Sequence, residues 1–205
     1  MDSIRMTASI ENKLEIVPGR ECGSCTLCCK VYNIPEIGKA AGKWCGQCKP
    51  GRGCKIHDNL PSQCADFDCL WRTDAAMPAQ WKPDQAKMVV TIHPLTRNIQ
   101  VQVDPGLPSA WSRQPYHDHL RQWSSKNMPK GMYVVVFVNE LATLVLPDQD
   151  VQLGPVTPEQ AITVRMEPGP GGGVYEIKVA TTRTTPDGQT FEFASTSRHP
   201  VRSVA

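Results

Sequence analysis

The sequence has no cysteine between Leu70 and Ala205, although it holds nine in total. All nine fall between Cys22 and Cys69. This absence excludes thiol catalysis, disulfides and thiolate metal sites from residues 70–205. Any such chemistry is confined to residues 22–69, which we call the cysteine segment.

The chain also lacks a long hydrophobic run. No stretch approaches the roughly 20 apolar residues that cross a bilayer, so we expect no membrane contact. The first residues include Asp2, Glu11 and Glu15, and they lack the apolar core and small-residue cleavage site of a secretory signal. These absences predict a cytoplasmic protein, in which thiols stay reduced and serve metals or catalysis.

Acidic residues are scarce in the cysteine segment. Between its first and last lysine the only acid is Glu36, against these basic residues: Lys30, Lys39, Lys43, Lys49, Arg52 and Lys55. Four thiolates on Zn²⁺ or on a [4Fe-4S]²⁺ core leave a net charge of about −2, which these cations can offset. The alternative is a solvated basic loop. No nucleic-acid partner is expected, because the net charge is only +2 and no aromatic ladder accompanies the basic residues.

The spacing of the cysteines is typical of soft-metal ligands. Two C-x-x-C pairs are present, and each such turn brings two sulfurs toward one point. The predicted metal ligands are all nine thiols: Cys22, Cys25, Cys28, Cys29, Cys45, Cys48, Cys54, Cys64 and Cys69. Few large apolar residues accompany them, so we expect metal to stabilise the segment, as structural zinc does by roughly 10 kcal/mol or more. Without metal the segment is expected to be disordered.

The cysteine pattern resembles that of a known family. The opening C-x-x-C-x-x-C-C run is followed by a later stretch whose matching residues are Cys54, Pro61, Cys64, Phe67 and Cys69. This arrangement is similar to the YkgJ-like C-x-x-C-x-x-C-C cysteine-cluster family, whose members are described as zinc- or iron-chelating proteins. His57 and Leu60 stand where that family has Tyr and Arg, and Ala65 stands where a basic residue is common. The resemblance implies metal chelation and no particular substrate.

The number of thiols leaves the kind of metal open. Two four-thiolate sites use eight of the nine cysteines, whereas one iron–sulfur cube uses four. C-x-x-C-x-x-C also begins the bacterial ferredoxin motif, which favours an iron–sulfur cluster such as [4Fe-4S] over Zn²⁺. Cys28 and Cys29 are adjacent, so we expect their side chains to diverge. Two other interpretations are Cys69 as a small core residue and Cys45 with Cys48 as a redox dithiol.

The sequence pattern changes after the cysteine segment. Lys82 and Pro83 mark a boundary between a metal-binding module, residues 1–84, and a β-rich region, residues 85–205. A strand-like run predicts a strand at 88–93, and period-two alternation predicts strands at 99–103, 162–166 and 175–179. A more deeply buried hairpin is predicted at 132–146, with its turn at Asn139 and Glu140. Further turns are expected at 169–173 and 186–188.

One helix is predicted near residues 115–126. Tyr116, Leu120 and Trp123 share one face, and Pro115 suits the first helical position. The fold class is therefore α+β: a small metal-stabilised cysteine-rich module followed by an antiparallel β-sheet region with one packed helix. Residues 195–205 are polar and lack periodicity, so a loose C-terminal tail is expected.

Three other features invite a functional interpretation. His117 and His119 point about 200° apart on a helix, so they cannot share one metal ion, and we expect them to face solvent. We expect His57 to support the thiol cluster through a hydrogen bond. The glycines at 169–173 lack the Lys-Ser/Thr and the helix of a phosphate-binding loop, so a flexible turn is expected.

Two classes of function follow from the sequence. The first is an iron–sulfur protein that transfers electrons or supports redox chemistry with a redox partner. The alternative is a zinc-stabilised module that binds a protein partner without catalysis. Methyl transfer is a third class, because a flagellin lysine methylase has a similar cysteine cluster, but no Gly-rich nucleotide turn is present. No nucleophile, base and orienting residue form a set, so enzymatic activity is left open.

Overall fold

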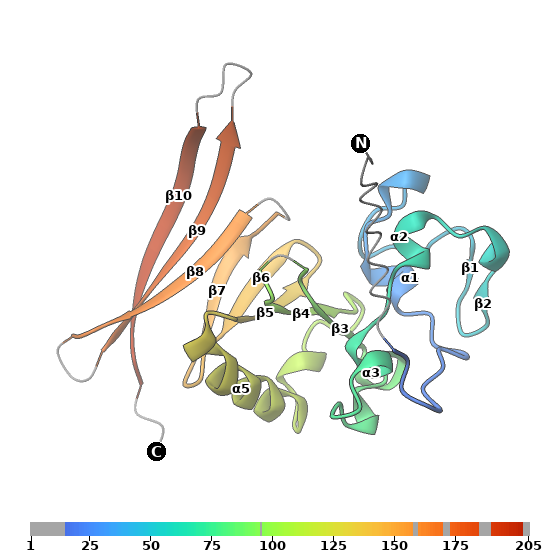
Figure 1. Ribbon diagram of the computed structural model, residues 1–205, viewed down its shortest axis with the longest axis horizontal. Coiled ribbons are helices and arrows are strands. Elements are labelled where there is room, and N and C mark those ends of the chain that lie inside the picture. Colours follow the sequence, from blue (N-terminus) through green and yellow to red (C-terminus); the bar gives the residue numbers. More distant parts are fainter. Residues whose placement is uncertain (1–14, 95, 158–159, 170–172, 185–189, 203–205) are drawn as a thin grey trace, which may run out of the picture.

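The computed structural model describes residues 15–94, 96–157, 160–169, 173–184 and 190–202. The cysteine segment and the residues after it form short elements that gather at one end of the molecule (Figure 1). In chain order they are α1 (Cys28–Val31), η1 (Pro35–Ile37), β1 (Cys48–Lys49), β2 (Gly53–Cys54), η2 (His57–Asn59), α2 (Ser62–Ala65), α3 (Leu70–Thr73), η3 (Ala79–Trp81) and α4 (Pro83–Ala86).

A five-stranded sheet forms the centre of the protein. Its strands are β3 (Met88–Ile92), β4 (Ile99–Val103), β5 (Val134–Val138), β6 (Leu141–Val145) and β7 (Asp150–Pro155), in spatial order β3-β4-β5-β6-β7. The predicted central hairpin is confirmed, since β5 and β6 pair antiparallel and most of their residues are buried. Asn139 at its turn has φ 56°, a left-handed conformation that Asn tolerates better than most residues.

One pairing in this sheet corrects the expectation of a purely antiparallel arrangement. Strand β4 pairs with β5 in parallel, with Val101 opposite Val136. Between these strands the chain forms η4 (Ala110–Ser112), α5 (Tyr116–Asn127) and η5 (Met128–Lys130). A connection of this length carries the chain back to the starting end of the sheet, so the next strand runs in the same direction.

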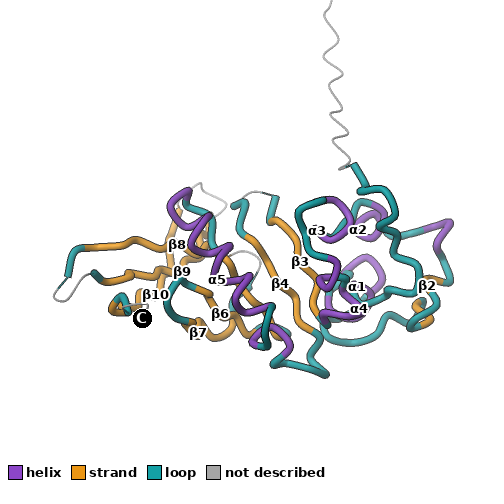
Figure 2. The backbone as a smooth tube through the Cα atoms, turned by 90° about the horizontal axis from the view of Figure 1, so that it is seen from below, coloured by secondary structure: helices purple, strands orange, loops and turns teal. Residues whose placement is uncertain are grey.

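The helix predicted near 115–126 is confirmed as α5, which lies across the five-stranded sheet (Figure 2). Leu120 is fully buried and packs in one core with Trp81, Met88 and Val134. Pro115 is the N-cap rather than the first helical residue. Among the described residues, no helix has the length and apolar content needed to span a bilayer.

The opposite face of the five-stranded sheet packs on a second sheet. That sheet has the order β10-β9-β8, with β8 (Gln160–Glu167), β9 (Val174–Thr184) and β10 (Thr190–Pro200). Val135 and Leu144 contribute to this second core, and Ile177 covers them. Val134 and Val136 belong to the first core and Val135 to the second, as period-two alternation requires. The α+β fold class is thus confirmed.

The C-terminal tail was expected to be loose, and this is wrong up to Pro200. Every residue from Ser195 to Pro200 pairs with β9. The described side chains of β10 are mostly exposed, so no apolar alternation marks this strand in the sequence. The predicted turns connect β8 with β9 and β9 with β10, but residues 170–172 and 185–189 lie outside the described part of the chain.

Candidate thiol metal centre

Both C-x-x-C pairs form tight turns. The backbone N–H of Cys25 donates to the carbonyl of Cys22 at 2.8 Å, and that of Cys48 donates to the carbonyl of Cys45 at 3.0 Å. Gly23 has φ 52° in the first turn, a conformation that glycine adopts without steric cost. The turns therefore hold each pair of thiols close in space, as the spacing predicted.

Backbone contacts then bring together cysteines that are distant in sequence. The N–H of Cys45 donates to the carbonyl of Cys29 at 3.0 Å, which joins the second turn to α1. Cys48 and Cys54 lie directly opposite one another in the β1–β2 pair. The N–H of Gly51, between these two strands, donates to Oγ1 of Thr26 at 3.0 Å. These bonds fix the second half of the cysteine segment onto the first.

The thiols surround one cavity of about 670 Å³. Eight of the nine cysteines line it: Cys22, Cys25, Cys28, Cys29, Cys45, Cys54, Cys64 and Cys69. Cys48 does not. Part of the wall is apolar and includes Tyr32, Ile34, Phe67 and Val89. This volume lies within the range of about 300–1,000 Å³ that is usual for ligand sites.

None of the nine cysteines forms a disulfide, and all of them lie within the described residues. In that part of the chain, no three or more Cys, His, Asp or Glu side chains already converge on one point as metal ligands. The donor chemistry nevertheless fits a soft metal, because cysteine side chains from several loops line a single cavity. The predicted ligands are therefore brought to one place, and coordination by them stays a prediction.

The thiols are held in their neutral form where they are buried together. Burial is the main cause that raises the pKa of Cys48, to about 11, and the neighbouring Cys29 adds to the effect. Burial likewise raises the pKa of Cys25, Cys64 and Cys69. Several thiolates that are buried close together repel one another and lack water to solvate them. A bound metal cation offsets this cost, because it attracts each thiolate.

Cys28 and Cys29 do not diverge as expected. Both side chains line the same cavity, and the neighbouring thiol of Cys28 is the largest cause that raises the pKa of Cys29. The thiols of Cys29 and Cys48 also act on each other's pKa. The short helix α1 therefore places both adjacent thiols on the side that faces the second C-x-x-C turn.

One of the basic residues faces the thiols as a counter-charge. Lys39 is only 7% exposed, and its ammonium donates to the carbonyls of Lys30, at 2.8 Å, and of Tyr32. Burial lowers its pKa, while the nearby thiolates of Cys45 and Cys29 act in the opposite direction. The other basic residues lie elsewhere: Lys30 pairs with Asp104, and exposed positions hold Lys43, Lys49, Arg52 and Lys55.

The cysteine segment and the residues on either side of it also form contacts that do not depend on metal. The guanidinium of Arg20 donates to four carbonyls, those of Trp71 at 2.7 Å, Asp74 at 2.8 Å, Ala75 at 3.2 Å and Met77 at 2.8 Å. Leu27 and Val31 pack with Val89 of β3 and with Cys69. Cys69 thus belongs to a small core and also lines the cavity, so both interpretations of this residue apply.

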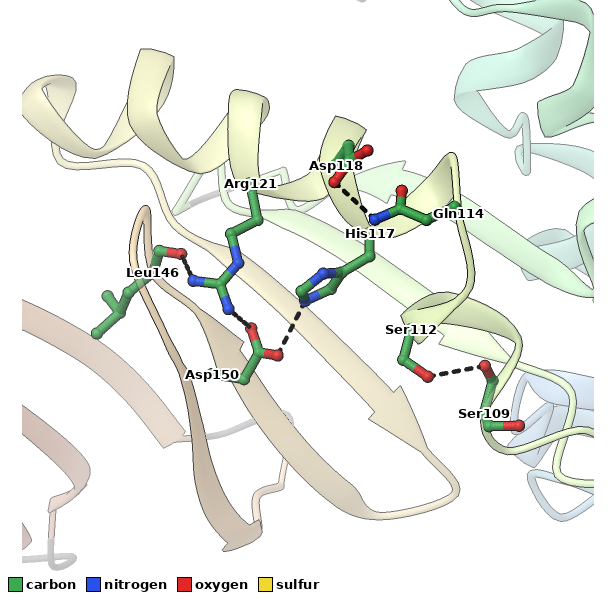
Figure 3. A network of polar contacts seen from close by, with 8 residues as sticks. All are labelled: Ser109, Ser112, Gln114, His117, Asp118, Arg121, Leu146 and Asp150. Carbon is green, nitrogen blue, oxygen red and sulfur yellow. Dashed lines mark hydrogen bonds and ion pairs between the residues drawn. The ribbon is translucent and has the colours of Figure 1, made fainter. Parts of the chain in front are cut away.

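The histidines are engaged differently from what the sequence predicted. Nε2 of His117 lies 2.9 Å from Oδ2 of Asp150, which also pairs with Arg121 at 3.1 Å (Figure 3). His119 accepts a hydrogen bond on Nδ1 from Nε1 of Trp81 at 2.9 Å. Each of these two histidines of α5 contacts a neighbouring element, so neither side chain points only into solvent. His57 lines the thiol cavity, in agreement with a place beside the cluster.

Sequence reasoning missed Asp84 at this site. Burial is the largest cause that raises the pKa of the Cys25 thiol, and the carboxylate charge of Asp84 adds to it. Pro83, the residue before Asp84, lines the thiol cavity. Asp84 follows the boundary dipeptide Lys82-Pro83, so the sequence marked it as the end of a module. Only the tertiary fold places it next to a cysteine so distant along the chain.

Neither a protein-family model, nor a curated protein, nor a solved structure matches this chain. The resemblance to the YkgJ-like cysteine-cluster family therefore stays a prediction that rests on the cysteine spacing.

Proposed function

We propose that this protein binds metal through cysteine thiolates in the cavity of the cysteine segment, as a cytoplasmic iron–sulfur protein that transfers electrons or supports redox chemistry. The observation that carries the proposal is the convergence of eight free thiols on a single cavity. Free thiols at this density are stable in a reducing compartment, where they serve metals rather than disulfides.

Two features favour an iron–sulfur cluster over a single zinc ion. The cavity volume of about 670 Å³ is more than one tetrahedral ion needs. Cys22 is exposed, so a cluster held there lies close to the surface and to a redox partner. When bound, such a cluster supplies one-electron chemistry. The chain's own part is to hold it, to offset its charge through Lys39, and to limit access of water with Tyr32 and Phe67.

A specific observation supports the zinc alternative. The turn of Cys45 and Cys48 leads directly into the β1–β2 hairpin, which brings Cys54 opposite Cys48. Paired cysteines from a turn and a short hairpin are typical of structural zinc modules, in which the metal stabilises the fold and catalyses nothing. The protein would then act as a binding module for a protein partner.

Spectra and metal analysis of the anaerobically purified protein test the proposal. We expect broad absorbance near 400 nm that bleaches with dithionite, with iron and sulfide in equal amounts. A colourless protein with one or two zinc ions per chain would reject the redox function and leave the zinc module. A folded protein without either metal would reject both.

A further inference from the structure

The cysteines fall into two groups, each joined by its own set of hydrogen bonds. Residues just before Cys22 are tied to residues just after Cys69: the N–H of Val17 donates to the carbonyl of Arg72 at 2.8 Å, and Arg20 donates to the carbonyl of Trp71 at 2.7 Å. Cys22 and Cys25 therefore lie beside Cys69. The charges of both also act on the thiol of Cys69.

The other six cysteines are joined by a different set of bonds. Cys45 is bonded to Cys29 through the backbone, and Cys48 pairs with Cys54. Helix α2, which carries Cys64, is held to the loop after α1, because N and Oγ of Ser62 donate to Glu36 at 3.0 and 3.1 Å. Gln63 adds a bond to the carbonyl of Asn33 at 2.8 Å. This second group thus comprises Cys28, Cys29, Cys45, Cys48, Cys54 and Cys64.

The smaller group has three thiols, one fewer than a tetrahedral site requires. Asp84 adjoins it: Pro83, the residue before it, lines the cavity, and the charge of Asp84 acts on the thiol of Cys25. Oδ1 of Asp84 is buried and has no hydrogen-bond partner among the described residues, while Oδ2 lies 3.7 Å from the ammonium of Lys82. A buried carboxylate oxygen without a partner is costly unless something binds it. Aspartate is an established ligand of zinc alongside cysteine.

On this basis we propose that the cavity holds two metal centres, and that Asp84 completes the one formed by Cys22, Cys25 and Cys69 as its oxygen ligand. The six remaining thiols form the other centre. This inference rests on the proposed function, because ligands can be assigned to two centres only if the protein binds metal. It assigns a ligand that the cysteine pattern does not contain.

The test compares Asp84→Asn with the matched variant Asp58→Asn, which changes an exposed aspartate within the same module. Full-length proteins are purified anaerobically, exposed equally to EDTA, and analysed over time for metal retained per chain. We expect Asp84→Asn to lose part of its metal at least about tenfold faster than the wild type, with the rest retained. Asp58→Asn should behave as the wild type does, and Asp84→Cys should restore retention with a fourth thiolate.

Two double variants test the division itself. Cys22→Ser with Cys25→Ser should remove only the fast-released share of metal, and Cys45→Ser with Cys48→Ser only the other. If Asp84→Asn retained as much metal as a metal-loaded wild type, the role of Asp84 would be overturned and the proposed function would stand. Loss of all metal in either double variant would overturn the two separate centres. A wild type without metal would reject the proposed function itself.

Discussion

Cys48 and Cys54 are direct partners across the β1–β2 pair. The N–H of Lys55 donates to the carbonyl of Gln47 at 2.8 Å, so Gln47 and Lys55, the pair next to Cys48 and Cys54, are a hydrogen-bonded pair. Pairs alternate in an antiparallel ladder, so Cys48 and Cys54 form a non-hydrogen-bonded pair, with a typical Cα separation of about 4.5 Å. That separation suits a disulfide.

We therefore expect mild oxidation of the metal-free protein to crosslink Cys48 with Cys54. Peptide mapping by mass spectrometry after diamide treatment measures this, and the metal-loaded protein serves as the control, in which the crosslink should be suppressed. Crosslinks confined to other cysteine pairs would show that this register is not maintained without metal.

The raised pKa of Cys48 predicts the order in which thiols react. A pKa of about 11 leaves only about a thousandth of this thiol ionised at pH 8, and the thiolate is the form that attacks iodoacetamide. In the reduced, metal-free protein, the exposed Cys22 should be alkylated first and the buried Cys48 among the last. Raising the pH from 8 toward 11 should accelerate Cys48 strongly. Rapid, uniform alkylation of all nine thiols at pH 8 would contradict this order and would instead support the disorder that the sequence predicts for the metal-free segment.

Arg20 is expected to join the chain just before the cysteine segment to the chain just after it. Arg20→Ala removes bonds to four carbonyls and should lower the free energy of unfolding by about 2 kcal/mol, an estimate reduced because part of this contact is exposed. Arg20→Lys should recover little, since an ammonium lacks the planar fork that reaches several acceptors. Denaturant unfolding measures both. Arg52→Ala is the control, an exposed arginine whose loss should cost less than about 0.5 kcal/mol.

Trp81 is the largest residue of the first module that is fully buried in the main core. It is fully buried, contacts Tyr116 and Trp123 at ring-centroid distances of 4.9 and 4.8 Å, and donates to His119. Trp81→Ala should cost about 3–5 kcal/mol of unfolding free energy, because it leaves a cavity. The half-exposed Trp44 offers a matched comparison, and Trp44→Ala should cost less than about 1 kcal/mol. Similar losses for both variants in thermal or denaturant unfolding would contradict this placement.

The elements that could be predicted from sequence are those with strong local periodicity. Helix α5 follows from Tyr116, Leu120 and Trp123 on one face, and the β5–β6 hairpin follows from two apolar runs around Asn139. Strand β10 could not be found in this way. It is an edge strand whose described side chains are mostly exposed to solvent. Backbone pairing with β9, rather than a buried apolar face, holds it in place.

The site was predictable in composition and not in arrangement. The spacing of the thiols identified both tight turns, which depend on residues close in sequence. The approach of Asp84 to Cys25 and the clamp of Arg20 on the carbonyl of Trp71 depend on how distant segments pack. The parallel pairing of β4 with β5 is of the same kind, since the crossover through α5 determines its direction. No local pattern encodes such contacts.

X-ray absorption at the iron and zinc edges of the anaerobically purified protein tests the central claim most directly, because it reports which atoms surround the bound metal. We predict a first shell dominated by sulfur at about 2.3 Å, with a minor oxygen contribution if Asp84 is a ligand. An iron–iron distance in the same spectrum would identify a cluster. Absence of bound metal, or a shell of oxygen and nitrogen alone, would contradict the proposal that the cysteine segment is a thiolate metal site.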